Sequence, residues 1–126
     1  MTPVWIRLDV IVALHKEQIN QHGGCHGIRD LGALQSALTR PQQLLNYVVP
    51  DIADLAASIA FGIVRSHPFV DGNKRMSFLA TVMFLNLNGY SIPIKDYHDV
   101  WNALAADKIS EKDLAKWPRE QIVQWP

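Results

Sequence analysis

Residues 51–75 read Asp51-Ile-Ala-Asp-Leu-Ala-Ala-Ser-Ile-Ala-Phe-Gly-Ile-Val-Arg-Ser-His-Pro-Phe-Val-Asp-Gly-Asn-Lys-Arg75, an apolar segment that leads into a polar loop. Apolar side chains in the first part recur with the i, i+3, i+4, i+7 spacing of an amphipathic helix that opens at Pro50-Asp51. Pro68 disfavours helical geometry for the residue before it, so this helix is expected to end there. A second segment, from about Asn73 to Asn88, is apolar nearly all round and indicates a buried central helix. The sequence thus predicts a polar loop between two central helices.

The loop itself, residues 67–75, combines a titratable base, a carboxylate, a glycine, an amide and two cations. Lys74 and Arg75 fall in the first turn of the following helix, where positive charge opposes the helix dipole. A phosphate bound at that helix end removes the conflict, because free backbone N–H groups and both side chains can hold it. Each residue alone has an ordinary explanation, since His67-Pro68 can end a helix and Asp71-Gly72 is a common turn pair. Together they favour a functional site.

Four further helices are expected around the central pair. They cover residues 9–22 with Asp9 as N-cap, residues 30–40 with Asp30 as N-cap and Pro41 as the stop, residues 96–106, and residues 111–116 with Ser110 as N-cap. The apolar face of the first comprises Val10, Ala13, Leu14 and Ile19. Gly89 is expected to end the second central helix, and Ser91-Ile-Pro-Ile94 to be extended. These patterns predict an all-α bundle with little or no strand and one domain over residues 1–126.

Composition limits the function classes. With 126 residues, 48% of them hydrophobic, the chain is long enough for one domain with its own core. Its formal charge of +0 argues against direct nucleic-acid binding, so anion binding must be local. A single cysteine excludes an internal disulfide and suits a reducing compartment. The N-terminus does not resemble a signal peptide, and the apolar run from Met76 to Leu87 is too short to span a bilayer, so we expect a cytoplasmic protein without a membrane anchor.

The loop resembles the signature of the Fic/Doc superfamily, His-Pro-Phe-x-Asp/Glu-Gly-Asn-Gly/Lys-Arg. Lys74 stands where the adenylyl-transferring members carry glycine, and Phe78 stands where most of them carry a second arginine. Both departures are typical of the death-on-curing (Doc) toxins, and residues 23–38 resemble the segment that precedes the core in that branch. The length also suits a Doc-type toxin, so the resemblance covers nearly the whole chain and implies a compact Fic/Doc helical bundle.

The resemblance implies a toxin of a toxin–antitoxin pair that uses ATP and Mg²⁺ to phosphorylate a hydroxyl of a protein target. In the best-studied members of the branch the target is a threonine of elongation factor Tu, and its phosphorylation halts translation. Adenylyl transfer to a protein hydroxyl stays open as an alternative, as does an interaction module without turnover. The Ser/Thr-x-x-x-Glu inhibitory helix of some relatives is absent before Glu17, Glu111 and Glu120. The expected inhibitor is therefore a separate antitoxin.

Chemistry and resemblance give the loop residues the same roles. Histidine is the side chain best suited to accept a hydroxyl proton near neutral pH, so His67 is the expected catalytic residue. Asp71 is a hard oxygen ligand suited to Mg²⁺ held together with nucleotide phosphates. The residues expected to bind the nucleotide are Gly72, Asn73, Lys74 and Arg75.

Other polar residues are weaker candidates. The donors of His22-Gly-Gly-Cys25-His26 lack an evident fourth ligand, which argues against a metal site there. Arg29 and Asp30 either support the site or, for Asp30, cap a helix. Arg65 either reaches phosphate or pairs with a surface acid. The remaining histidines and tryptophans are read as structural or as the rim of a partner groove; they are His15, His98, Trp5, Trp101, Trp117 and Trp125.

Overall fold

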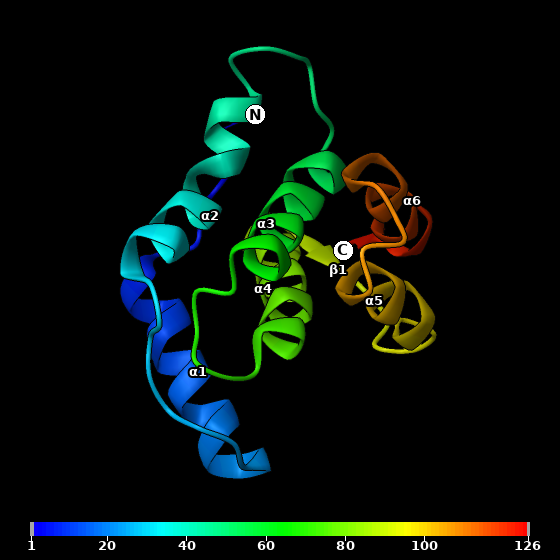
Figure 1. The fold of residues 1–126 in the computed structure, drawn as a ribbon. Coiled ribbons are helices and arrows are strands. Elements are labelled where there is room, and N and C mark those ends of the chain that lie inside the picture. The colour runs from blue at the N-terminus through cyan, green and yellow to red at the C-terminus, as the bar shows by residue number, and fades with distance from the viewer. Residues whose placement is uncertain (1, 126) are drawn as a thin grey trace.

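The computed structural model describes residues 2–125, and over this range the chain forms six helices and one short antiparallel ribbon (Figure 1). The elements are α1 (Leu8–His22), α2 (Leu31–Leu44), α3 (Ile52–Ser66), α4 (Asn73–Leu87), β1 (Tyr90–Ser91), α5 (His98–Ala105), α6 (Glu111–Gln121) and β2 (Val123–Gln124). The predicted all-α bundle with a loop between two central helices is confirmed. No helix among the described residues is long and apolar enough to cross a membrane.

Helix α3 forms the centre of the core. Its apolar spacing buries most of its length, and α2, α4 and α6 pack around it (Figure 1). The helix begins with a capping box, in which the Asp51 carboxylate accepts from the backbone N–H of Asp54 at 2.8 Å and the Asp54 carboxylate accepts from Asp51 N–H at 3.0 Å. Arg119 of α6 donates to both carboxylates, and its guanidinium lowers the pKa of Asp51 below the ordinary 3.8. These hydrogen bonds connect the start of α3 to α6.

An aromatic cluster fastens α5 and α6 to α4. Phe78 stacks on Tyr97 with 3.9 Å between ring centroids and meets the edge of Trp101 at 5.1 Å. Trp101 also meets Trp117 edge to face, and its indole N–H donates to the Ser77 hydroxyl at 2.9 Å. Both tryptophans are buried, as expected of core residues. The side chain at position 78 therefore packs in the core and offers no charge to the loop.

The predicted first helix is nearly correct in extent, but its N-cap is wrong and only Leu14 and Ile19 of its predicted apolar face are at least partly buried. It begins at Leu8 with Arg7 as N-cap, and Asp9 lies inside the first turn, where Arg7 pairs with it at 2.9 Å. The buried face consists of Ile11, His15 and Ile19, whereas Val10 is exposed. The apolar pattern was misleading because a buried histidine occupies the central position of the face.

Two helices run past prolines: Pro41 was expected to stop its helix, and the helix expected over residues 111–116 extends past Pro118 to Gln121. Helix α2 continues past Pro41, whose ring is fully buried in the core. Helix α6 likewise continues past the buried Pro118. In both cases packing of the ring offsets the helix hydrogen bond that proline cannot make. The Asp30 and Ser110 N-caps are as predicted, accepting at 3.0 Å from Ala33 N–H and Asp113 N–H.

The C-terminal region departs from expectation in smaller ways. The segment after Gly89 is extended only at β1, which pairs with β2 in the register Tyr90 with Gln124 and Ser91 with Val123. The helix expected from residue 96 begins at His98, because Asp96 adopts a left-handed φ of 59°. The ribbon places the end of the described chain beside the end of α4, where Trp125 N–H donates to Gly89 O at 2.9 Å.

Candidate active site

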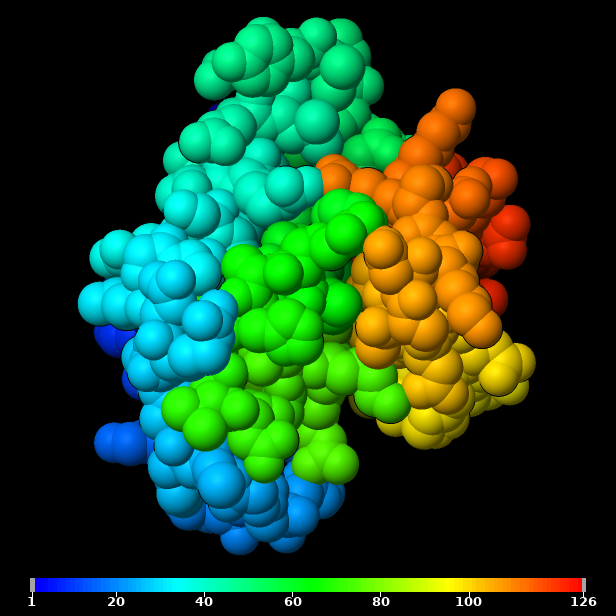
Figure 2. Space-filling model, in the orientation of Figure 1, coloured from blue at the N-terminus to red at the C-terminus, as the bar shows by residue number. Residues whose placement is uncertain are grey.

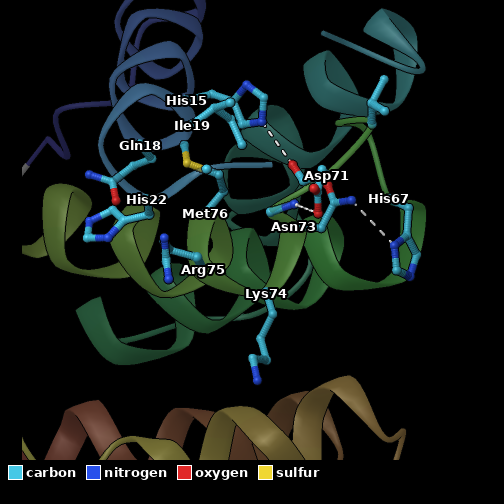
Figure 3. A pocket seen from close by; sticks show the side chains of 13 residues that line it. His15, Gln18, Ile19, His22, His67, Asp71, Asn73, Lys74, Arg75 and Met76 are labelled. Atoms are coloured by element: carbon cyan, nitrogen blue, oxygen red, sulfur yellow. Dashed lines mark hydrogen bonds between the residues drawn. The ribbon is translucent and has the colours of Figure 1, made fainter. Parts of the chain in front are cut away.

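The loop between α3 and α4 borders a cavity of about 500 Å³ that opens between α1 and α4 (Figure 3). His67 ends α3 in a left-handed conformation with φ of 47°, and Gly72 begins α4 with φ of 80°. A positive φ costs a non-glycine residue roughly 1 kcal/mol or more, so surrounding contacts must hold His67 there. The cavity is lined by His15, Gln18, Ile19, His22, Gly23, His67, Val70, Asp71, Gly72, Asn73, Lys74, Arg75 and Met76.

Asn73 closes the loop on itself. It is only 9% exposed, its Oδ1 accepts from Phe69 N–H at 3.0 Å, and its Nδ2 donates to Phe69 O at 2.9 Å. This pairing fixes the orientation of the amide, because each end faces a backbone group that can only donate or only accept. Nδ2 also lies 3.4 Å from Nδ1 of His67, which is a weak contact (Figure 3). Asn73 therefore holds the loop and touches the expected base.

The Asp71 carboxylate is oriented by two backbone groups. Its Oδ1 accepts from Gly72 N–H at 2.8 Å, and its Oδ2 accepts from Cys25 N–H at 3.1 Å. The side chain remains exposed at the cavity wall. An ionised carboxylate offers about four acceptor sites, so both oxygens keep lone pairs for a cation. Among residues 2–125 no three His, Cys, Asp or Glu side chains gather into a metal-binding group.

His15, expected to be structural, contacts the loop from the buried face of α1. It is 3% exposed, its ring stacks on Phe69 with 4.0 Å between centroids, and its Nε2 donates to the carbonyl of Asp71 at 2.9 Å. Because a carbonyl can only accept, Nε2 carries a proton. The buried face of α1 therefore fixes the backbone of the residue expected to bind metal.

The segment that follows α1 is paired with the loop. Ile28 and Phe69 form an isolated antiparallel bridge, and Val70 N–H donates to Gly27 O at 3.0 Å. Asp30 both caps a helix and supports the site, the two roles that the sequence left open. Its carboxylate caps α2, and its N–H donates to Pro68 O at 3.0 Å. Residues 24–30, called here the brace, therefore fix the loop along its length.

The two cations of the loop point in different directions (Figure 3). Gly72 has no side chain to cap α4, and the N–H groups of Asn73, Lys74 and Arg75 have no partner within the helix. Arg75 lines the cavity. Lys74 extends toward α5, where its ammonium donates to Oδ1 of Asn102 at 2.8 Å. The helix terminus is thus open to an anion, while Lys74 is held away from it.

Of the weaker candidates, His22 lines the cavity, whereas Arg65, His98 and the side chain of Cys25 lie outside this arrangement. Arg65 pairs with Asp107 at 2.7 Å and lies over the ring of Phe61. Of its two expected roles, the structure therefore shows the pairing with a surface acid. Cys25 is exposed, and only its backbone N–H is tied to the site. His98 is exposed on α5 and stacks on Tyr97.

Gly24 is required where the brace meets Asp71. Its φ is +112°, and a Cβ at this position would lie 2.7 Å from Oδ2 of Asp71. Gly89 offers a control outside the catalytic cavity, because its φ is +87° but a Cβ there would meet nothing within 4 Å. We expect Gly89→Ala and Gly24→Ala each to lose at least about 1 kcal/mol of stability from the positive φ. Only Gly24→Ala should displace Asp71 and lower activity and Mg²⁺ affinity, as measured by turnover and metal titration. Equal activity of the two variants would contradict this role of Gly24.

Comparison with known families matches residues 5–85 to the Fic/DOC family. Protein kinase doc of Escherichia phage P1 is 30% identical over 85 residues, which cover 67% of this chain and 68% of that protein. Toxin Doc of Mycolicibacterium smegmatis (strain ATCC 700084 / mc(2)155) is 39% identical over 72 residues, covering 56% of this chain and just over half, 55%, of that toxin. The matched region spans α1 to α4 with the loop, and it confirms the resemblance drawn from the loop residues. The chain belongs to the Fic/DOC family.

Proposed function

We propose that this protein is a toxin that transfers the γ-phosphoryl group of ATP to a hydroxyl of a protein target. The observation that carries the proposal is the convergence of His67, Asp71 and the uncapped N-terminus of α4 on one cavity. These are a base, an oxygen ligand for Mg²⁺ and an anion site, which phosphoryl transfer requires together. The kinship with proteins named Protein kinase doc and Toxin Doc favours both parts of the proposal.

The residues of the cavity fit ATP and Mg²⁺. Proteins usually hold Mg²⁺ through one or two carboxylates together with substrate phosphates, and Asp71 supplies one carboxylate with free lone pairs. Three N–H groups at the start of α4 and the side chain of Arg75 can receive phosphate oxygens. When bound, Mg-ATP supplies the phosphoryl group and the charge neutralisation for its transfer.

His67 would accept the proton of the target hydroxyl at Nε2, the ring nitrogen that does not face Asn73. In the present arrangement Asn73 Nδ2 faces Nδ1, so Nδ1 is the acceptor and the neutral ring carries its proton on Nε2. Catalysis therefore needs the other tautomer, with the proton on Nδ1. The contact to be lost is only 3.4 Å long and weak, and such hydrogen bonds often rearrange when substrate binds.

Lys74 would contribute its ammonium to the phosphates after leaving Asn102. The Lys74–Asn102 bond is exposed, so exchanging it for a phosphate contact costs little. Once turned toward the phosphates, the lysine side chain would occupy space that glycine would leave for the α-phosphate deep against α4. We therefore propose that the terminal phosphate lies beside His67 and that the diphosphate points outward.

The transferred group is identified by the mass of the modified target. We expect an increase of about 80 Da with release of ADP, the values for one phosphoryl group. The decisive experiment incubates the protein, Mg²⁺ and a cell extract with ATP labelled at either the α- or the γ-phosphate. Label from the γ-position alone supports phosphotransfer. An AMP-sized increment with pyrophosphate release would establish adenylyl transfer, and the absence of both labels would favour an interaction module without turnover.

We propose a threonine of elongation factor Tu as the target, so that the modification inhibits translation. The basis is the kinship with the Doc toxins. Expression of this chain alone in a susceptible bacterium should arrest growth and protein synthesis. Purified elongation factor Tu should gain the label in vitro, and mass spectrometry of its peptides locates the residue. Unimpeded growth in the presence of abundant folded protein would contradict the toxin assignment.

We further propose that a cognate antitoxin inhibits the protein through an amphipathic segment laid beside the site. A groove of about 440 Å³ runs along α1 and α4 and is lined by Leu14, Leu79, Val82, Met83, Asn86, Leu87 and Trp125. Leu14 and Leu79 lie one helical turn from Gln18 and Arg75 of the catalytic cavity. An apolar helix face in this groove would therefore end at the mouth of the cavity.

A further inference from the structure

The side chain of Arg29 closes the C-terminal end of α3. Its Nε donates to the carbonyl of His67 at 2.6 Å, and its Nη2 donates to the carbonyl of Ser66 at 2.5 Å. Carbonyls in the last turn of a helix have no N–H donor within the helix and need hydrogen-bond partners from elsewhere. A guanidinium at this end also interacts favourably with the helix dipole. Arg29 therefore satisfies two successive carbonyls with one rigid, planar group.

Binding these two carbonyls together determines the backbone conformation of His67. The Ser66 carbonyl belongs to the peptide plane before His67, and the His67 carbonyl belongs to the plane after it. The angle between the planes is set by φ and ψ of His67, here 47° and 60°. Few non-glycine residues adopt this left-handed conformation unless their surroundings impose it. The fork of Arg29 thus acts on the conformation that directs the imidazole.

Arg29 is itself fixed on the loop it holds. Its backbone N–H donates to Pro68 O at 2.7 Å, one position after the two carbonyls bound by its side chain. Asp30 N–H binds the same oxygen, and the Ile28–Phe69 bridge continues the pairing. Figure 2 shows this light-blue segment against the green loop on one face of the molecule. These bonds fix the backbone of Arg29 beside the two carbonyls that its side chain binds.

We propose that Arg29 is a positioning residue that sets the orientation of His67 for proton transfer, an inference that rests on the proposed function. Arg29 does not line the catalytic cavity, and two of its nitrogens are occupied by backbone carbonyls. It acts on the reaction through His67 and does not touch the substrate. The side chain of Arg29 thereby links the brace to the base.

The test compares Arg29→Ala and Arg29→Lys with a matched arginine that supports α3 away from the site. Arg40 donates from Nε to the carbonyl of Ser58 at 2.9 Å and pairs with Glu111, so Arg40→Ala also removes an arginine from an α3 carbonyl. We expect Arg29→Ala to lower kcat about 10- to 100-fold, the effect of a misplacement near 1 Å, with KM for ATP nearly unchanged. Arg29→Lys should retain part of the activity, because an ammonium can reach one carbonyl but cannot bridge both in a fixed geometry. Arg40→Ala should lower Tm and leave kcat intact below Tm.

Chemical rescue separates positioning from general stabilisation. Guanidinium chloride at low, non-denaturing concentration should restore part of the kcat of Arg29→Ala, since the free cation can occupy the vacated site. It should not restore activity to His67→Ala. Equal kcat for Arg29→Ala and the wild type, or a loss reproduced by Arg40→Ala at equal folded fraction, would overturn the proposal.

A second measurement does not depend on transfer activity. In the wild type the amide protons of Val70 and Asp30 should exchange slowly, and the imidazole of His67 should give one sharp set of NMR signals. Arg29→Ala should speed exchange at both amides and shift or broaden the His67 signals, while Arg40→Ala should not. If the wild type transfers no group, the proposed function fails, and these signals still decide the role of Arg29. Unchanged His67 signals in Arg29→Ala would refute it.

Discussion

Replacing His67 by alanine is expected to lower phosphotransfer by about 10² to 10⁴-fold, the usual contribution of a general base. Growth arrest should disappear with it. The imidazole is exposed and its hydrogen-bond contact to Asn73 is long, at 3.4 Å, so its loss removes little packing. We expect Tm to stay within about 3 °C of the wild type, which corresponds to less than roughly 1 kcal/mol for a domain of this size.

The measurement is single-turnover transfer of γ-labelled phosphate, with growth arrest scored in parallel. His98→Ala is the control, because this exposed histidine lies on α5 outside the catalytic cavity. It should keep full activity and toxicity. Wild-type turnover by His67→Ala would remove His67 from the mechanism and leave the loop as an anion site alone.

The central part of the fold could be predicted because its signals are local. The apolar spacing of α3, its capping aspartate and the proline after His67 each specify structure within a few residues. The buried face of α1 could not be predicted in the same way. His15 is buried there because Phe69 and the carbonyl of Asp71 receive its ring, and neither is near it in sequence. Tertiary contacts thus override the apolar pattern in α1.

The same distinction between local signals and distant contacts applies to the candidate site. The base, the carboxylate, the amide and the helix terminus lie within residues 67–75, so one stretch of sequence indicated them together. The brace and the direction of Lys74 depend on partners 28 or more residues away, such as Asn102. No pattern of spacing indicates such partners. For Arg29 the available signal was the family resemblance of its segment, which implied a place near the site without giving its geometry.

Asn73→Ala is expected to cost roughly 2–6 kcal/mol of stability and to abolish transfer. The substitution removes both hydrogen bonds to Phe69, leaving a buried N–H and a buried carbonyl without partners. Each such group costs about 1–3 kcal/mol. We call the paired hydrogen bonds of an asparagine amide to one backbone unit a clasp. Without the Asn73 clasp, the backbone between His67 and α4 is free to move, so the base and the anion site lose their relative positions.

The chain offers a closely matched control at the other end of the same helix. Asn88 uses the same arrangement on the backbone of Val4, accepting from its N–H at 2.7 Å and donating to its carbonyl at 2.9 Å. Asn88→Ala should therefore reduce the free energy of unfolding, although less, because its bonds are more exposed. Activity at a temperature where both variants are fully folded separates the two effects.

Under those conditions Asn88→Ala should transfer phosphate at the wild-type rate, while Asn73→Ala should remain inactive. The reason is that the Asn88 amide binds the N-terminal segment and the last turn of α4, whereas the Asn73 amide binds the backbone of the loop that carries His67 and Asp71. Should Asn73→Ala recover activity once folded, the clasp would be a stabilising feature only. The orientation of the base would then depend on the brace, and above all on the two carbonyls held by Arg29.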